Sequence, residues 1–152
     1  MRPLQLKLTG INSYREEQII DFETLTSQGL FGIFGPTGSG KSSILDAMTL
    51  ALYAKLPRDT KNFINTNEKK ANVSFLFSIT TDKTRKYLAE RSFRYHTGNN
   101  ASTVRNTTGR LILYEGDTET VLADKPTEVT NECIRLLGLT SEDFMRTVVL
   151  PQ

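Results

Sequence analysis

The feature that most constrains this chain is a glycine-rich segment, Gly35-Pro36-Thr37-Gly38-Ser39-Gly40-Lys41-Ser42. It matches the pattern G-x-x-x-x-G-K-[ST], in which backbone N–H groups and the N-terminus of the next helix surround a phosphate. The glycines let the backbone approach the anion without a Cβ in the way. Lys41 is expected to bridge the β- and γ-phosphates, and the Ser42 hydroxyl to ligate Mg²⁺. The segment therefore predicts a nucleotide-phosphate site.

The sequence on either side of this segment has the pattern that the motif requires. Residues 30–34 form a short apolar run, which is typical of a strand buried on both faces. Ile44, Met48, Ala51 and Leu52 recur at helical spacing, and Pro57 predicts that this helix ends before it. A strand, a loop and a helix are thus expected in the order of a P-loop.

The rest of the chain alternates between strand and helix patterns, which predicts an α/β fold. Strands are expected at 4–8, 18–23, 73–79, 85–95 and 110–114, with a buried strand at 147–152. Helices are expected at 126–137, with Pro126 in its first turn and Gly138 just past its end, and from 141 onward. Residues 96–109 are rich in Gly, Asn, Thr and Ser and are expected to form a loop.

Charge is distributed unevenly along the 152 residues, although the net charge is only +2. Residues 51–110 carry 12 basic and 4 acidic side chains, which gives this part a net charge of +8. A basic segment of this kind either serves solubility or binds phosphates of nucleic acid. One Cys and one His exclude a disulfide framework and a His-rich metal site. The sequence contains no apolar run of membrane-spanning length and no signal peptide, so we expect a cytoplasmic location and no membrane partner.

The acidic partner that hydrolysis needs is missing from the sequence. A P-loop ATPase places an acidic residue after a second apolar strand, where it holds Mg²⁺. No run of four apolar residues in this chain ends in Asp or Glu. The chain also stops directly after the buried strand expected at 147–152. We therefore expect residues 1–152 to be a fragment of a longer protein.

Three stretches of the sequence carry a resemblance to a known family. The first runs from Leu6 to Tyr14 and continues with Ile20-Asp21-Phe22. The second runs from Gly29 to Met48, followed by Ala51-Leu52-Tyr53 and Pro57-Arg58. The third comprises residues 122–125, Gly138-Leu139, Phe144 and the terminal Val149-Leu150-Pro151-Gln152. Together they resemble the SMC-like, ABC-type DNA-repair ATPases that include the SbcC subunits of bacterial SbcCD nucleases.

The resemblance implies that residues 1–152 are the N-terminal half, or lobe I, of an ATPase head, with a mixed core sheet and an attached antiparallel sheet. A coiled coil and the C-terminal half of the head would follow in the longer protein. The implied function is ATP binding, with Mg²⁺, in the ATPase subunit of a nuclease complex that processes DNA double-strand ends. ATP would close a dimer of two heads and so gate an SbcD-like nuclease subunit.

The resemblance also implies roles for individual residues. Gln152 aligns with the glutamine that senses Mg²⁺ and the γ-phosphate, and it is a catalytic candidate together with Lys41. Some relatives carry an Arg near the nucleotide in the turn that Asn12 and Ser13 occupy here, so these two residues are candidates for nucleotide binding. Ser43, directly after the glycine-rich segment, is a further candidate. Basic residues of the middle segment, above all Lys61, Lys69, Lys70 and Arg105, are candidates for contacting duplex DNA without sequence specificity.

Two other functions remain open at this point. A small P-loop kinase would normally carry its P-loop near residue 10, an Arg-rich lid and its own Asp after a second strand, and this sequence has none of these. A DNA-binding head that does not hydrolyse ATP on its own is the other alternative.

Cys133 and the group Phe75, Phe77 and Phe93 are interpreted as packing residues.

Overall fold

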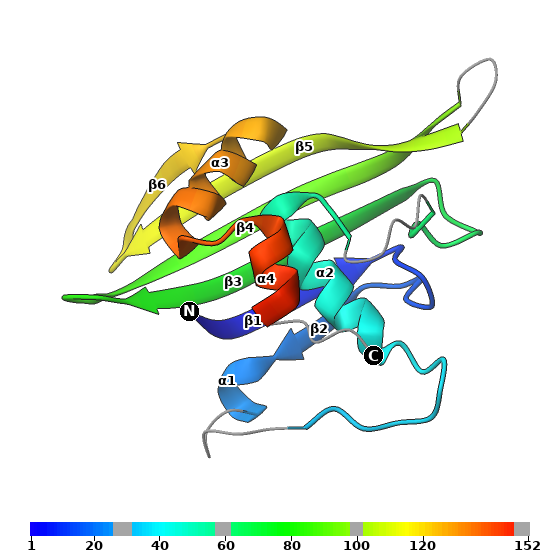
Figure 1. Cartoon of the computed structure of the whole chain (residues 1–152), viewed down its shortest axis with the longest axis horizontal. Helices are drawn as coiled ribbons and strands as arrows, with labels where there is room; N and C mark the ends of the chain where they lie inside the picture. Colours follow the sequence, from blue (N-terminus) through cyan, green and yellow to red (C-terminus); the bar gives the residue numbers. More distant parts are fainter. Residues whose placement is uncertain (26–31, 57–61, 98–101, 148–152) are drawn as a thin grey trace.

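The computed structural model describes residues 1–25, 32–56, 62–97 and 102–147. Their strands form one antiparallel sheet of six, in the order β2-β1-β3-β4-β5-β6, and α2, α3 and α4 lie over one of its faces (Figure 1). The strands are β1 (Arg2–Thr9), β2 (Gln18–Asp21), β3 (Lys70–Thr80), β4 (Thr84–Thr97), β5 (Ser102–Glu115) and β6 (Thr118–Ala123). The helices are α1 (Phe22–Leu25), α2 (Lys41–Tyr53), α3 (Pro126–Leu137) and α4 (Ser141–Thr147).

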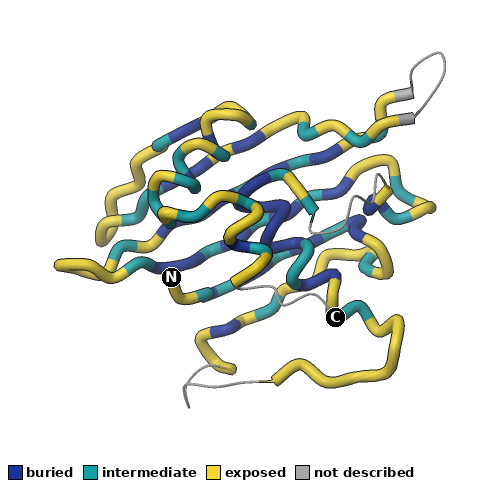
Figure 2. The backbone as a smooth tube through the Cα atoms, in the orientation of Figure 1, coloured by how far each residue is buried: buried dark blue, intermediate teal, exposed yellow. Residues whose placement is uncertain are grey.

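Alternating apolar residues place the core between the sheet and its helices. On β3, Val73, Phe75 and Phe77 are buried, whereas the residues between them are only partly buried. The ring of Phe77 stacks on Phe75 at 5.4 Å and on Tyr87 of β4 at 5.6 Å between centroids. Buried residues run along the middle of the sheet and through the helix in front of it (Figure 2). The period-two pattern thus sets which face of each strand meets the helices.

Helix α2 is the central helix of this layer, and nine of its 13 residues are buried. Its small residues Ala47 and Ala51 are fully buried, which lets the helix approach the sheet closely. Helix α3 begins with Pro126 and ends at Gly138, whose φ is 67°, as the sequence predicts. Cys133 on α3 is buried, and burial raises the pKa of its thiol to about 12, which fits a packing residue. No helix of the described ranges is long and apolar enough to span a bilayer.

Three element predictions were wrong, and each has a physical reason. Residues 102–109, assigned to a loop, belong to β5 because β4 pairs with their backbone despite their Thr- and Asn-rich composition. Strand β6, whose first five residues have no buried side chain, was missed because it lies at the sheet edge. Thr147 ends a helix rather than beginning a strand, and the remaining residues of that predicted strand lie outside the described residues.

The predicted strand at 30–34 also requires correction where the structure describes it. Residues 32–34 form no strand, and Ile33 and Phe34 are 40% and 92% exposed. A strand buried on both faces needs neighbouring strands, and the described residues offer none there. Within the described ranges every strand pair is antiparallel, so the α/β class and the antiparallel sheet are present, while the mixed core sheet stays a prediction.

Candidate nucleotide site

The glycine-rich segment lies at the N-terminus of α2, as the motif requires. Gly40 is the N-cap, with φ of 88°, and it contributes no side-chain hydrogen bond to the first turn of the helix. The N–H groups at the start of a helix have no partner within the helix, and the helix dipole makes this end positive. Residues 35–42 are mostly exposed, so an anion can reach these groups from solvent. This end of α2 therefore has the properties of a phosphate site.

Lys41 lies within the loop that it is expected to serve. Its ammonium group donates to the carbonyl oxygens of Gly35 at 2.6 Å and Pro36 at 2.7 Å. The Ser39 N–H donates to the Pro36 carbonyl at 3.2 Å, which closes the turn in front of the helix. The segment from Gly35 to Ser39 thus curves around the Lys41 charge. A bound phosphate would replace these carbonyl groups as the partner of the ammonium.

The turn at residues 10–14 packs against the end of the loop. The Tyr14 hydroxyl donates to the Gly40 carbonyl at 3.4 Å. A Cβ on Gly40 would lie 2.7 Å from the Tyr14 hydroxyl oxygen and 2.8 Å from its ring. Position 40 therefore requires glycine both for its positive φ and for the close approach of Tyr14.

Asn12, in the turn at residues 10–14, contacts Ser43 in the first turn of α2. Its φ is 48°, and its side-chain nitrogen donates to the Ser43 hydroxyl at 2.9 Å. The Asn12 N–H donates to the Phe63 carbonyl at 2.8 Å, and the Asn65 side chain donates to the Asn12 carbonyl at 2.6 Å. The turn, the loop before β3 and the first turn of α2 thus form one hydrogen-bonded unit. Ser13 is exposed in the same turn, and nucleotide contacts by either residue stay predictions.

The metal side of the predicted site is only partly within the described residues. Ser42 is exposed at the helix N-terminus, where its hydroxyl fits an Mg²⁺ ligand beside a bound phosphate. Gln152 lies outside the described residues. Helix α4, which precedes it in the chain, packs on the C-terminal end of α2 through Phe144, whose ring lies 5.4 Å from Tyr53. The described part of the chain holds no cluster of three or more His, Cys, Asp or Glu residues that could bind a metal.

Sequence reasoning missed the roles of two residues beside this site and the burial of a third residue in the core. Tyr14 and Asn65 support the loop and the turn, and no spacing rule in the sequence marked them. Arg91 was grouped with basic residues that serve solubility or bind DNA, and this is wrong because its side chain is only 2% exposed. The alternation of Tyr87, Ala89 and Phe93 on the buried face of β4 could have revealed this, since Arg91 shares their register.

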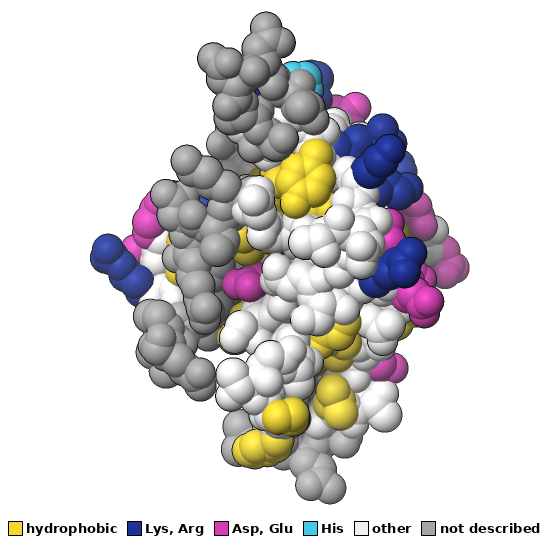
Figure 3. Space-filling model, turned by 90° about the vertical axis from the view of Figure 1, so that its right-hand side faces the viewer, with side chains coloured by type: hydrophobic (Ala, Val, Ile, Leu, Met, Phe, Trp, Pro, Cys, Tyr) yellow, Lys and Arg dark blue, Asp and Glu magenta, His cyan; other side chains and the backbone are white. Residues whose placement is uncertain are grey.

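Basic residues of three adjacent strands line up on the helix-free face of the sheet. Lys70 lies opposite Arg94 across β3 and β4, and Arg94 lies opposite Arg105 across β4 and β5. All three side chains are exposed, and none has an ion pair within the described ranges. We call these three residues the cationic row. Figure 3, which shows the right-hand side of Figure 1, has several Lys and Arg side chains gathered at its upper right. Like charges directly opposite destabilise a sheet, so an anionic partner would relieve this row.

Two of the four predicted DNA-contacting residues lie in strands of the sheet. Lys70 is the first residue of β3, and Arg105 lies in β5. Lys69 is exposed just before β3, and Lys61 lies outside the described residues. On the same helix-free face, a depression of about 980 Å³ is lined by side chains of both signs, including Lys7, Glu90 and Arg110.

Comparison with known proteins finds relatives over the whole chain and a matching family model over most of it. Residues 5–145 match the family model described as an AAA domain. The chain is 46% identical over 152 residues to the SbcC subunit of the SbcCD nuclease of Clostridium acetobutylicum and 50% identical over 155 residues to that of Bacillus subtilis. It is 34% identical over 157 residues to a probable DNA double-strand break repair Rad50 ATPase of Aquifex aeolicus. All of this chain is covered in each case, but only 13%, 13% and 14% of the relatives' lengths.

Proposed function

Because this chain belongs to the AAA-domain family, we propose that it is the ATP-binding N-terminal part of an ATPase subunit in a DNA-end-processing nuclease complex. The observation that carries this proposal is the exposed P-loop at the start of α2, supported by identities of 46% and 50% to the SbcC subunits of two SbcCD nucleases. The proposed nucleotide is ATP, because the Aquifex aeolicus relative is named as an ATPase.

The proposed roles of the loop residues follow from their positions. The backbone N–H groups of this loop, except at Pro36, which has none, would surround the phosphates, and Lys41 would turn from the Gly35 and Pro36 carbonyls toward the β- and γ-phosphates. The Ser42 hydroxyl would hold Mg²⁺, which would supply charge neutralisation for the phosphates. Asn12, Ser13 and Ser43 would contact the nucleotide from the side of the 10–14 turn, and Gln152 is proposed as the residue that senses Mg²⁺ and the γ-phosphate.

We further propose that residues 1–152 are one half of a split ATPase head, lobe I in an SMC-like protein. The exposed Ile33 and Phe34 support this, because an apolar segment ahead of a P-loop is normally covered by neighbouring strands. Strands from a later part of a longer polypeptide would add the mixed core sheet and the acidic catalytic residues. The short share of the relatives that the chain covers is consistent with this arrangement.

The proposed partners are an SbcD-like nuclease subunit, a second copy of the head and duplex DNA, in the cytoplasm. ATP would be held between two heads, so that binding closes the dimer and hydrolysis opens it. The cationic row supports the DNA contact. Adjacent strands are about 4.8 Å apart, so the backbones of its three residues span about 10 Å, and their long exposed side chains can reach neighbouring backbone phosphates.

The experiment that tests this function measures ATP hydrolysis by the full polypeptide with its nuclease partner. Replacing Lys41 with Ala removes the charge that contacts the transferring phosphate, so hydrolysis is expected to fall at least 100-fold, on the order of 3 kcal/mol of transition-state stabilisation. The matched control is Lys125→Ala, which removes an exposed lysine paired with Glu128 on α3. Normal hydrolysis by the Lys41 variant would rule out the P-loop assignment.

A further inference from the structure

Arg91 on β4 is a charged side chain buried in the core, and its relative exposure is 2%. Its Nε donates to the Ala51 carbonyl at 2.8 Å, and Nη2 donates to the Leu52 carbonyl at 3.0 Å and the Thr130 hydroxyl at 2.9 Å. Nη1 donates to the Pro126 carbonyl at 2.8 Å. When the Asn106 amide is oriented so that both its oxygen and its nitrogen have hydrogen-bond partners, Nη1 also donates to the Asn106 oxygen at 2.7 Å. All five N–H groups of the guanidinium then have an acceptor.

The acceptors around Arg91 are neutral, and two of them are carbonyl groups at the C-terminal end of α2. The last carbonyls of a helix have no partner within the helix. At the end of α2, the Leu50 carbonyl accepts from the Ala54 N–H at 2.9 Å, and the next two carbonyls accept from Arg91. A cation at this position also interacts favourably with the negative end of the helix dipole. The guanidinium therefore links the C-terminal end of α2 to β4.

Two local features of β5 make this arrangement possible. Gly109 lies directly opposite Arg91, and a Cβ there would lie 3.0 Å from the Pro126 Cα. The missing side chain thus lets α3 approach until the Pro126 carbonyl reaches Nη1. An irregularity in the pairing of β4 with β5 at Ser92 and Phe93 places Asn106 on the same side as Arg91.

The two ends of α2 are therefore fastened by different devices. At the N-terminal end, Asn12 and Tyr14 contact Ser43 and Gly40, next to the residues expected to bind phosphate. At the C-terminal end, Arg91 holds the carbonyls of Ala51 and Leu52. A helix of 13 residues is about 20 Å long and moves as a rigid unit, so a shift at one end reaches the other.

We propose that Arg91 is a positioning residue for the nucleotide site, which acts through α2 by fixing the depth and direction of the helix that carries Lys41 and Ser42. This inference rests on the proposed nucleotide binding and assigns a remote residue to it. Arg91 contacts no P-loop residue itself, and its effect on nucleotide affinity passes through the backbone of α2.

The test compares Arg91→Lys with the wild type in the full polypeptide, using a fluorescent ATP analogue with Mg²⁺. Lysine keeps the positive charge but donates from a single nitrogen, so it cannot reach all the acceptors of the guanidinium. The dissociation constant for the analogue is expected to rise about tenfold at a temperature where both proteins are folded. Amide hydrogen exchange in the first turn of α2 is expected to accelerate relative to β3. Arg135→Lys, an exposed Arg→Lys change on α3, is the control and is expected to match the wild type.

A lower unfolding temperature with an unchanged dissociation constant would overturn the inference, because Arg91 would then serve stability alone. If Arg91→Lys does not fold, Thr130→Val removes one acceptor of Nη2 with little change in shape, and it is expected to weaken analogue binding about threefold. An unchanged dissociation constant in that variant would equally overturn the inference. Failure of the wild type to bind the analogue would instead contradict the proposed function.

Discussion

Arg91 and Arg94 lie three residues apart on β4, yet the pleat of the strand gives them opposite surroundings. Arg91 faces the helices and is buried, whereas Arg94 faces solvent on the helix-free side, between Lys70 and Arg105. Composition alone treats the two residues alike, and only the register separates them. The sequence was sufficient to identify the P-loop, because that motif is local. It was not sufficient for Tyr14, Asn65 or Arg91, whose side chains bind the carbonyl groups of Gly40, Asn12 and Ala51, which lie 26, 53 and 40 positions away in the chain.

Gly40→Ala is expected to destabilise the protein, because the new side chain would meet both backbone strain and a steric contact at this position. A φ of 88° is strained for any residue with a Cβ, at about 1–2 kcal/mol, and the new Cβ would also lie 2.7 Å from the Tyr14 hydroxyl. We expect Mg-ATP binding to be lost and the free energy of unfolding to fall by more than that strain. Gly116→Ala is the matched control, since its φ is 60° and nothing lies within 4 Å of its Cβ. Chemical denaturation with a binding titration checks this, and equal losses of stability in both variants would contradict the account of Tyr14.

At the scale of elements, the strands with strict alternation could be predicted from the sequence, and those without it could not. The strands at 4–8, 73–79 and 85–95 show a clear period of two, because one face is covered by helices. The first half of β5 and all of β6 have weak apolar patterns, since their stability comes from backbone pairing with β4 and β5. Residues 32–34 misled the prediction for another reason, which is that an apolar run forms a buried strand only if neighbours cover it.

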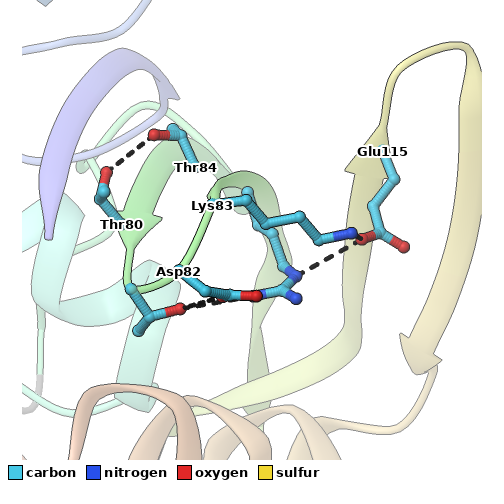
Figure 4. A network of polar contacts seen from close by, with 7 residues as sticks. Thr80, Asp82, Lys83, Thr84 and Glu115 are labelled. Carbon is cyan, nitrogen blue, oxygen red and sulfur yellow. Dashed lines mark hydrogen bonds and ion pairs between the residues drawn. The ribbon is translucent and has the colours of Figure 1, made fainter.

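An ion-pair cluster joins the β3–β4 turn to the end of β5 (Figure 4). Glu115 accepts from Lys83 at 2.8 Å and from Arg85 at 3.4 Å, and Arg85 also donates to Asp82 at 3.1 Å. Lys83, and then Arg85, hold the pKa of Glu115 below its ordinary value of 4.5. Because the folded-state pKa is lowered, the stabilisation is present above pH 4.5 and is lost as the pH falls through the folded-state pKa.

Glu115→Gln is therefore expected to lower the urea midpoint of unfolding at about pH 7 and to have little effect near pH 3. The contribution is modest because the pair is exposed and is screened by salt. Glu119→Gln, an exposed glutamate on β6, is the control for removing a negative charge nearby. If the difference between Glu115→Gln and the wild type were the same at both pH values, the ion pairs would not be its cause.

At the scale of the whole molecule, the sheet separates two sets of residues to which we have assigned proposed functions. The P-loop helix lies on one face, and the cationic row lies on the other, with β4 contributing to both. Three basic residues of the middle segment thus lie side by side on one face of the sheet, whereas Arg91 from the same segment is buried under the other face. The arrangement places proposed ATP binding and proposed DNA binding on opposite sides of one sheet.

Charge reversal of the cationic row, as Lys70→Glu, Arg94→Glu and Arg105→Glu together, is expected to weaken binding of duplex DNA by the full polypeptide. Each lost phosphate contact reduces the slope of log affinity against log salt by about one. A matched triple variant on other exposed lysines and arginines, Lys83→Glu, Lys125→Glu and Arg135→Glu, controls for net charge. Equal DNA affinity and equal salt slope in the wild type and the cationic-row variant would contradict this role.

The central claim is that the N-terminus of α2 with its glycine-rich loop binds ATP, and calorimetric titration of Mg-ATP tests it most directly. We expect the wild-type polypeptide to bind, and Lys41→Ala to bind at least tenfold more weakly while its thermal unfolding is unchanged, because the Lys41 ammonium is exposed and contacts only the loop. Equal dissociation constants for the wild type and the Lys41→Ala variant would contradict the account.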